Sequence, residues 1–267
     1  MKINIVFFTS TGNSFFLALR AKYFFEKMTE HRVGMYDVVT SNYEEVINCD
    51  ALGIFYPVWM SDMPDHLQNF CKRLLKDSVK KNIFIVGNCA SGTDNSQLYW
   101  KRKLERAGHK VNYAAMLKMP SNFNISLLAR DASEVEINEL KERAVVNLQE
   151  ICSDISAGVT KNLSDGLASK LYAIQRLFFY FKSKWGYKYM KLAESRCTKC
   201  QMCVKLCPME NIKPDGNGNI SFGKKCIMCA KCFNYCPTNA VLIGKKSEDA
   251  SKYHRYFCKE IKPIFYR

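Results

Sequence analysis

Near the N-terminus, residues 2 to 14 read Lys2-Ile3-Asn4-Ile5-Val6-Phe7-Phe8-Thr9-Ser10-Thr11-Gly12-Asn13-Ser14. The first part, Lys2 to Phe8, is an apolar run of strand length. Directly after the polar loop, Phe15 to Phe25 carries apolar residues at helical spacing. The stretch therefore predicts a strand, a short loop and a helix.

Further along, the same alternation of short apolar runs and helical patterns continues. Four more runs predict strands at Arg32 to Val38, Ala51 to Tyr56, Asn82 to Gly87 and Val111 to Lys118. Helical spacing predicts helices at Asp65 to Leu75, Ser96 to Ala107 and Ala132 to Ile155. The sequence therefore predicts an α/β domain over residues 1–157: a doubly wound, parallel, five-stranded sheet with helices on both faces.

The loop after the first strand has the chemistry of an anion site. Hydroxyl side chains, the flexible Gly12 and the exposed amides of a helix start can together surround a phosphate dianion. The residues concerned are Thr9, Ser10, Thr11, Gly12, Asn13 and Ser14. Neither a Walker loop nor a G-x-G-x-x-G fingerprint occurs. A helix capped by Ser and Thr, with no ligand, is the alternative interpretation.

In open α/β sheets, ligands lie beyond the carboxyl ends of the strands. After the third strand, Pro57, Val58 and Trp59 begin a long loop, and after the fourth comes the amide-rich run Asn88, Cys89, Ala90, Ser91 and Gly92. We expect the two loops to bracket a planar ring, with Trp59 as a stacking face. Burial of Trp59 in the core is the alternative.

A second site is indicated by two copies of the pattern C-x2-C-x2-C-x3-C-P. The copies contain Cys197, Cys200, Cys203 and Cys207, and Cys226, Cys229, Cys232 and Cys236. This pattern binds 4Fe-4S clusters, so we predict two of them. Zinc sites pair C-x2-C halves and do not need this repeated run. The other five cysteines are scattered and predict small buried side chains.

These motifs resemble those of a known family. Residues 1 to about 155 resemble a flavodoxin-type domain, whose T-x-T-G-N-[ST] loop holds the FMN phosphate and matches Thr9, Thr11, Gly12, Asn13 and Ser14. The whole chain resembles bacterial flavodoxin-domain proteins fused to a two-cluster ferredoxin, which are usually described as electron-transfer proteins. One departure is that residues 88–95 contain no aromatic side chain to cover the second flavin face.

The resemblance also implies how the cysteines divide. In two-cluster ferredoxins, the fourth cysteine of each run ligates the other cluster. By that resemblance one cluster is held by Cys197, Cys200, Cys203 and Cys236, and the other by Cys226, Cys229, Cys232 and Cys207.

The remaining segments complete the expected organisation. Residues 158–192 predict amphipathic connecting helices, 193–244 a small α+β domain of the bacterial ferredoxin type, and 245–267 a tail that packs back on either domain. We predict a cytoplasmic protein without a transmembrane anchor, because the N-terminus lacks a signal-peptide pattern and no apolar run is long enough to span a bilayer.

The distribution of charge along the chain indicates what kind of molecule the protein binds. The net charge is +15, and residues 151–267 hold 21 Lys and Arg against 8 Asp and Glu. Bound clusters and a flavin phosphate would lower this excess without removing it. With no nucleic-acid motif present, we expect the basic half to dock an acidic redox partner of the ferredoxin or flavodoxin type, and we expect no nucleic acid.

Three hypotheses follow for function. FMN and the clusters would couple one-electron carriers to two-electron chemistry. Alternatively, the protein is a reductase with its own small-molecule substrate on the open flavin face, near residues 119–123. A third hypothesis is a non-catalytic binding or sensing protein. Direction of electron flow and direct use of NAD(P)H are left open by the sequence.

Overall fold

The structure is a computed structural model that describes residues 1–28, 30–91, 94–123, 132–161, 175–178, 185–249 and 253–267. The chain divides into two compact units. The sheet unit comprises Met1–Thr9, Asn13–Pro120 and Glu134–Leu177. The cysteine unit comprises Ser10–Gly12, Ser121–Ser133 and Phe178–Arg267.

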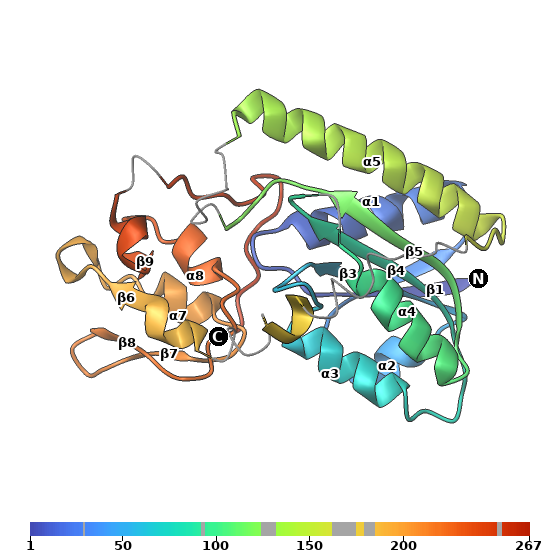
Figure 1. Ribbon diagram of the computed structural model, residues 1–267, viewed down its shortest axis with the longest axis horizontal. Helices are drawn as coiled ribbons and strands as arrows, with labels where there is room; N and C mark the ends of the chain where they lie inside the picture. The colour runs from blue at the N-terminus through green and yellow to red at the C-terminus, as the bar shows by residue number, and fades with distance from the viewer. Residues whose placement is uncertain (29, 92–93, 124–131, 162–174, 179–184, 250–252) are drawn as a thin grey trace. The chain divides into compact units, whose positions relative to one another are not determined.

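A five-stranded parallel sheet with the order β2-β1-β3-β4-β5 forms the centre of the sheet unit (Figure 1). Its strands are β1 (Lys2–Phe7), β2 (Arg32–Asp37), β3 (Ala51–Pro57), β4 (Asn82–Cys89) and β5 (Lys110–Lys118). The inner strands are buried almost throughout, as expected for a sheet covered on both faces. This strand order is that of the flavodoxin-like doubly wound fold.

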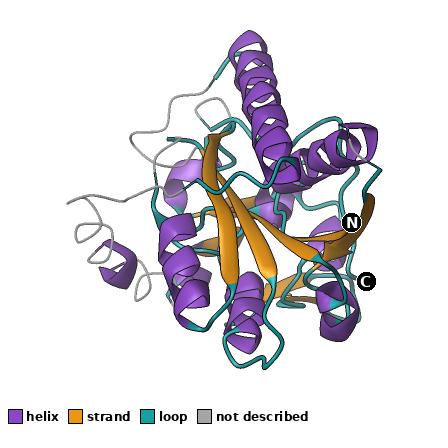
Figure 2. Ribbon diagram, turned by 90° about the vertical axis from the view of Figure 1, so that its right-hand side faces the viewer, coloured by secondary structure: helices purple, strands orange, loops and turns teal. Residues whose placement is uncertain are grey.

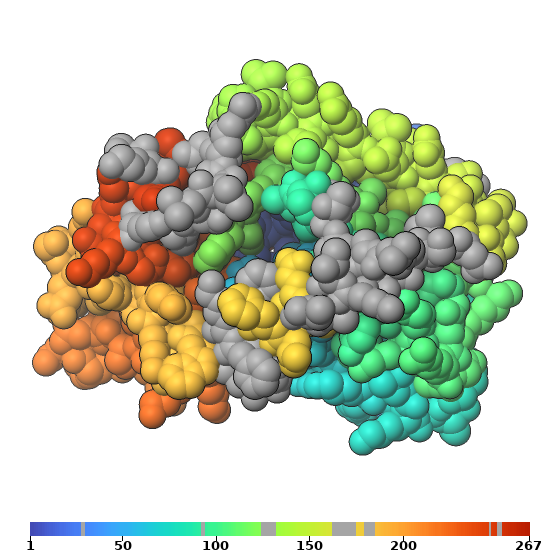
Figure 3. Space-filling model, in the orientation of Figure 1, coloured from blue at the N-terminus to red at the C-terminus, as the bar shows by residue number. Residues whose placement is uncertain are grey.

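Helices cover both faces of the sheet (Figure 2). On one face lie α1 (Asn13–Met28) and α5 (Glu134–Ser156), which pack against each other. On the other lie α2 (Tyr43–Ile47), α3 (Asp65–Leu74) and α4 (Ser96–Arg106). Much of α5 faces solvent, and its side chains form part of the surface in Figure 3.

The predicted sheet is therefore confirmed, with each strand boundary within two residues of the expected one. Among the described helices of the sheet unit, α2 is the one that was not expected. It spans five residues, and its N-cap Asn42 accepts a hydrogen bond from the amide of Glu44 at 2.8 Å.

The cysteine unit is built from short elements. Two antiparallel pairs, β6 (Met190–Leu192) with β9 (Val241–Ile243) and β7 (Ile212–Pro214) with β8 (Ile220–Phe222), accompany the helices α7 (Met202–Leu206) and α8 (Lys231–Asn234). The described residues of this unit also form short 3-10 helices: η1 (Gly186–Tyr189), η2 (Glu194–Arg196) and η3 (Lys245–Glu248). β6 falls inside the predicted connector, and its pairing with β9 extends the small domain toward the N-terminus. Most of the connector lies outside the described residues.

An internal repeat relates the two halves of this unit. The non-glycine residues with positive φ come in equivalent pairs: Lys199 and Met228, Gln201 and Ala230, Glu210 and Asn239. Their φ values lie between 47° and 58°. The Cys207 and Cys236 sulfurs accept hydrogen bonds from the equivalent amides of Asn211 and Ala240, at 3.3 and 3.2 Å. The same backbone conformation and the same amide–sulfur hydrogen bond thus occur in both halves.

The tail packs within the cysteine unit. The amide of Tyr256 donates to Asn234 Oδ1 at 2.9 Å, and the amide of Tyr266 donates to the Lys205 carbonyl at 2.8 Å. The amide of Cys258 donates to the Thr11 carbonyl at 2.7 Å. The tail is therefore bound both to the short helices and to the loop at residues 10–12. Among the described residues, no helix is long and apolar enough to cross a membrane.

Candidate functional site

The first candidate site begins at the loop between β1 and α1. Gly12 has φ +103°, a conformation that L residues rarely adopt, and α1 begins at the next residue, Asn13. Thr9, Ser10 and Thr11 are each at most 3% exposed. The backbone of Gly12 thus turns the chain from the strand into the helix over a very short distance.

Within the sheet unit, amide side chains hold the start of α1. Asn13 Nδ2 donates to the Pro120 carbonyl at 2.9 Å. Asn88 Nδ2, from the end of β4, donates to Ser14 Oγ at 2.7 Å and to the Tyr56 carbonyl at 2.9 Å. The ends of β1, β3, β4 and β5 are therefore tied together at the carboxyl edge of the sheet.

The chemistry of this loop fits a phosphate group. Its side chains supply hydroxyl groups, and the first turn of α1 contains no acidic residue that would repel an anion. The positive end of the helix dipole points to the same place. The assignment of these residues to a phosphate stays a prediction.

The loop after β3 contains a tight turn with unusual backbone geometry. Trp59 and Asp62 exchange two backbone hydrogen bonds of 2.7 and 2.9 Å. Between them, Met60 and Ser61 have φ +48° and +60°. Two successive non-glycine residues in the left-handed region cost about 1–2 kcal/mol each. Such a turn persists only where the surrounding structure supports it.

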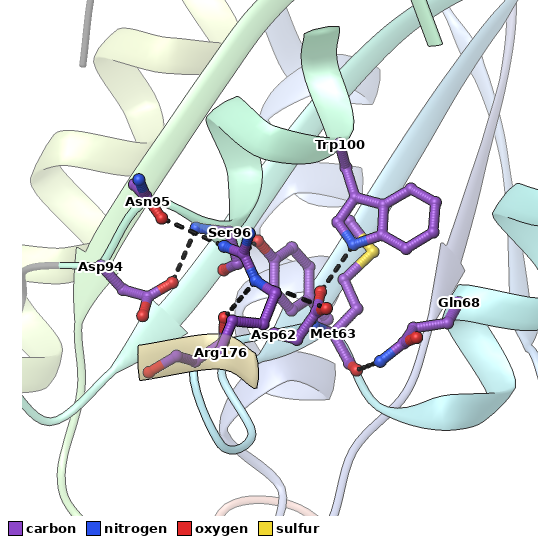
Figure 4. Close-up of polar contacts among 10 residues, drawn as sticks. Asp62, Met63, Gln68, Asp94, Asn95, Ser96, Trp100 and Arg176 are labelled. Carbon is purple, nitrogen blue, oxygen red and sulfur yellow. Dashed lines mark hydrogen bonds and ion pairs between the residues drawn. The ribbon is translucent and has the colours of Figure 1, made fainter. Parts of the chain in front are cut away.

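That support comes from Arg176, which is shown in Figure 4. Its Nε donates to the Ser61 carbonyl at 2.9 Å and lies 3.5 Å from Asp62 Oδ2, and its Nη2 donates to Asn95 Oδ1 at 3.1 Å. The guanidinium carbon lies 4.0 Å from the centroid of the Tyr99 ring. One mostly buried cation therefore connects the loop after β3 with the start of α4.

Asp62 is the second member of this network. Its Oδ1 accepts a hydrogen bond from Trp100 Nε1 at 2.7 Å. Burial raises the pKa of Asp62, while the Trp100 hydrogen bond and the Arg176 charge act in the opposite direction. Its carboxylate is thus held on two sides.

The other predicted ring-contacting residues occupy these two loops. Pro57, Val58 and Trp59 are half-buried at the end of β3, and the Val58 amide donates to the Asn88 carbonyl at 2.8 Å. In the loop after β4, Cys89 Sγ and Ser91 Oγ lie 3.4 Å apart, and Ala90 is exposed. Gly92 lies outside the described residues. The stacking role of Trp59 stays a prediction.

The cysteines form the second candidate site, and they line two separate cavities. One cavity is lined by a first cysteine set, Cys197, Cys200, Cys203 and Cys236, together with apolar residues such as Leu192 and Ile220. The other is lined by a second cysteine set, Cys207, Cys226, Cys229 and Cys232, together with residues such as Ile212 and Phe222. Each cavity thus combines three cysteines of one run with the fourth cysteine of the other.

A cavity with four thiols and apolar walls fits a thiolate-ligated cluster. Among the residues that the structure places, no three His, Cys, Asp or Glu side chains are arranged to hold a metal ion. The cysteines instead line the two cavities described above, four to each. The two sets correspond to the division that the resemblance implies, which stays a prediction until the ligands are tested.

Burial controls the acidity of these thiols. It raises the pKa of Cys203 to about 11 and that of Cys229 to about 12. At Cys236 burial acts in the same direction, but backbone hydrogen bonds at Val241, Thr238 and Ala240 outweigh it, and the pKa lies below the ordinary value. Metal ligation requires thiolates, so cluster insertion would release protons here.

Sequence reasoning did not identify Asp62, Trp100 and Arg176 as one group. Arg176 belongs to the connector, where its spacing indicated only the polar face of an amphipathic helix. No sequence motif signals a contact across more than a hundred residues.

Comparisons with known proteins match the two units of the chain separately. A family described as a 4Fe-4S dicluster domain matches residues 196–241. Pyruvate synthase subunit PorD of Methanocaldococcus jannaschii is 39% identical over 51 residues, 19% of this chain. The match spans 59% of the length of that curated relative.

Solved structures match the other part of the chain. The flavodoxin of Streptococcus pneumoniae TIGR4 is 17% identical, with a TM-score of 0.44, and the match covers 60% of this chain and all of that one. Megasphaera elsdenii flavodoxin is 22% identical, with a TM-score of 0.41, and covers 54% of this chain and 98% of its own. The chain thus joins a unit with the flavodoxin-like strand order to a small unit whose residues 196–241 match the 4Fe-4S dicluster family.

Proposed function

We propose that this fusion of a flavodoxin-like unit and a 4Fe-4S dicluster domain passes electrons between FMN and two 4Fe-4S clusters. The observation that carries the proposal is the pair of cavities, each lined by four cysteines, in a chain that also has the phosphate-type loop. When bound, FMN exchanges one or two electrons, whereas a cluster exchanges one. The protein would thereby couple one-electron carriers to two-electron chemistry.

In this proposal, Thr9 to Ser14 hold the FMN phosphate, and residues 57–59 and 88–92 border the ring. The first and second cysteine sets each hold one cluster. Buried hydroxyls, the helix start and the amide contacts of Asn13 and Asn88 support the FMN assignment. The apolar walls of the cavities support the cluster assignment.

Cofactor content is the first test. Anaerobic purification followed by iron, sulfide and acid-released flavin analysis is expected to give about eight iron, about eight sulfide and one FMN per chain. Electrons from a substoichiometric one-electron donor should then reach the flavin. In a Cys200→Ser/Cys229→Ser chain, which lacks one ligand of each set, flavin reduction should be at least tenfold slower. Absence of flavin, or equal rates in the two chains, would contradict the proposal.

Partner choice is proposed from charge. The cysteine unit carries a set of exposed lysines: Lys188, Lys191, Lys199, Lys205, Lys213, Lys224 and Lys225. They suit an acidic carrier of the ferredoxin or flavodoxin type, for which the association rate should fall as ionic strength rises. A rate that is unaffected by salt would exclude electrostatic docking.

A reductase with its own substrate is the second candidate. It is favoured by the described residues of the loop after β4, Asn88 to Ser91, which offer no aromatic ring to cover a second flavin face. Saturable, compound-specific reoxidation of the reduced protein would support it, whereas uniform slow reoxidation by every compound would favour the carrier.

Substitution of Arg176 by methionine should weaken FMN binding. The change removes the hydrogen bonds to Ser61 and Asn95 that hold two ring-bordering loops. We expect Kd for FMN to rise at least tenfold, about 1.4 kcal/mol, as measured by flavin fluorescence titration. The matched control is Arg106→Met at the exposed end of α4, which should leave Kd unchanged. Equal Kd values for the two variants would show that Arg176 does not support the site.

A further inference from the structure

In the described part of the chain, a half-buried and a fully buried cation lie beside the cysteine sets, and both involve the tail. The first is Arg255, a tail residue. Its Nη2 donates to the Val241 carbonyl at 2.9 Å, and its guanidinium carbon lies 4.0 Å from the centroid of the Phe233 ring. Val241 also lines the cavity of the first cysteine set. The guanidinium is thus hydrogen-bonded to a residue that lines that cavity.

The cysteines themselves interact with Arg255. Burial lowers the pKa of Arg255, and the neighbouring Cys236 and Cys232 act in the opposite direction, Cys236 more strongly. Nη1 of the same side chain is buried and has no well-aligned hydrogen-bond partner in the described part of the chain. A cluster sulfur bound by this cysteine set would accept a hydrogen bond from such a buried donor.

The second cation is Lys231. It is 1% exposed and lines the cavity of the second cysteine set. Its Nζ donates to the Ile264 carbonyl at 2.8 Å and lies 4.4 Å from the centroid of the Tyr266 ring. Both of these partners are tail residues and both are neutral. Burial of an ammonium group costs free energy, so contacts such as those with Ile264 and Tyr266 are needed to hold the Lys231 side chain in place.

The internal repeat gives Lys231 a natural comparison. Its equivalent in the first half is Met202, which also starts a short helix and lines the cavity of the first set. The same backbone position thus carries an apolar side chain beside one set and a cation beside the other. A cation beside the first set comes instead from the tail, as Arg255.

We propose that the tail sets the reduction potentials of the clusters by fixing one positive charge beside each. Arg255 acts chiefly on the cluster of the first set and Lys231 on that of the second. The inference rests on the proposed function, since it needs both clusters to be bound. Reduction adds a negative charge to a cluster, and a cation nearby in a poorly hydrated site stabilises the reduced state, so each potential is raised.

The test is a potentiometric titration of the full-length, anaerobically purified protein, followed by electron paramagnetic resonance. Arg255→Met and Lys231→Met remove the charges, and the second change copies the Met202 position. We expect each variant to lower a different one of the two midpoint potentials, by at least a tenfold change in the reduction equilibrium, or 59 mV for one electron. The double variant should lower both.

Matched controls separate charge from packing. Arg255→Lys and Lys231→Arg keep the charge and should keep potentials close to the original ones. Lys213→Met removes a positive charge from an exposed position on β7 and should leave both potentials unchanged. If a methionine variant loses iron, the glutamine variant at the same position is measured in its place.

The outcomes separate the two proposals. If the unmodified protein contains no clusters, the proposed function fails. If clusters are present in full and both charge-removing variants keep the original potentials, only the inference about the tail fails. If every charge-removing variant loses its clusters while the charge-retaining ones keep them, the cations are needed for assembly, and a tuning role is overturned.

Discussion

Replacement of Gly12 by alanine is expected to reduce FMN affinity about a hundredfold, or about 3 kcal/mol. Two effects add at this position. The φ of +103° is unfavourable for any residue with a Cβ, and that Cβ would lie 2.8 Å from Cys258 Cβ and 3.3 Å from Ile261 Cβ. The loop or the tail must then move, and the hydroxyl and amide groups of residues 9–14 lose their arrangement. Fluorescence titration with FMN measures the effect.

Gly158→Ala is the matched control for this prediction. Gly158 also has a positive φ, +72°, but nothing lies within 4 Å of the position that its Cβ would take. It therefore carries the backbone cost without the collision, and its FMN affinity should stay near the original. In the Gly12→Ala background, Cys258→Gly should restore part of the affinity by removing the Cβ that collides. If Gly12→Ala binds FMN as well as Gly158→Ala does, contact with the tail is not what keeps this position a glycine.

Conversion of Cys236 to serine should remove about half of the iron, about four of eight atoms per chain. Cys236 is the last cysteine of the second run, yet it lines the cavity of Cys197, Cys200 and Cys203. The cluster lost should accordingly be that of the first set. Iron analysis and the electron paramagnetic resonance spectrum of the reduced protein would show which cluster remains.

Comparison among cysteine variants makes the division testable. Cys197→Ser should leave the same remaining spectrum as Cys236→Ser, and Cys207→Ser should leave the other one. Cys49→Ser, at a cysteine outside both sets, should keep all of the iron. A Cys236→Ser spectrum that matched Cys226→Ser instead would mean that each run holds its own cluster.

Much of this organisation follows from local sequence. The buried parallel strands are continuous apolar runs, so their positions are visible without any tertiary information. The cysteine spacing likewise identifies the small domain. The helix at Tyr43–Ile47 escaped prediction because five residues are too few to show a helical period, and its capping residue Asn42 is equally common in turns.

Contacts over long sequence separations could not be predicted. Nothing in the composition of the connector indicates that Arg176 reaches Ser61 and Asn95. The sequence also places Lys231 inside a motif without indicating that Ile264 and Tyr266 bury it. These interactions depend on where the tail and the connector pack in the folded chain. The periodicity and spacing of residues predict local structure but not this packing.

The hydrogen bond between Thr11 and Cys258 has a consequence for folding during synthesis on the ribosome. Its two partners lie far apart in the chain and are therefore synthesised roughly 10 to 50 seconds apart at usual elongation rates. The first strand and helix can form early, but the loop between them gains its support only after all eight cluster cysteines have been made. Full support of this loop is therefore a late event in synthesis, reached only after the cysteine unit has been made.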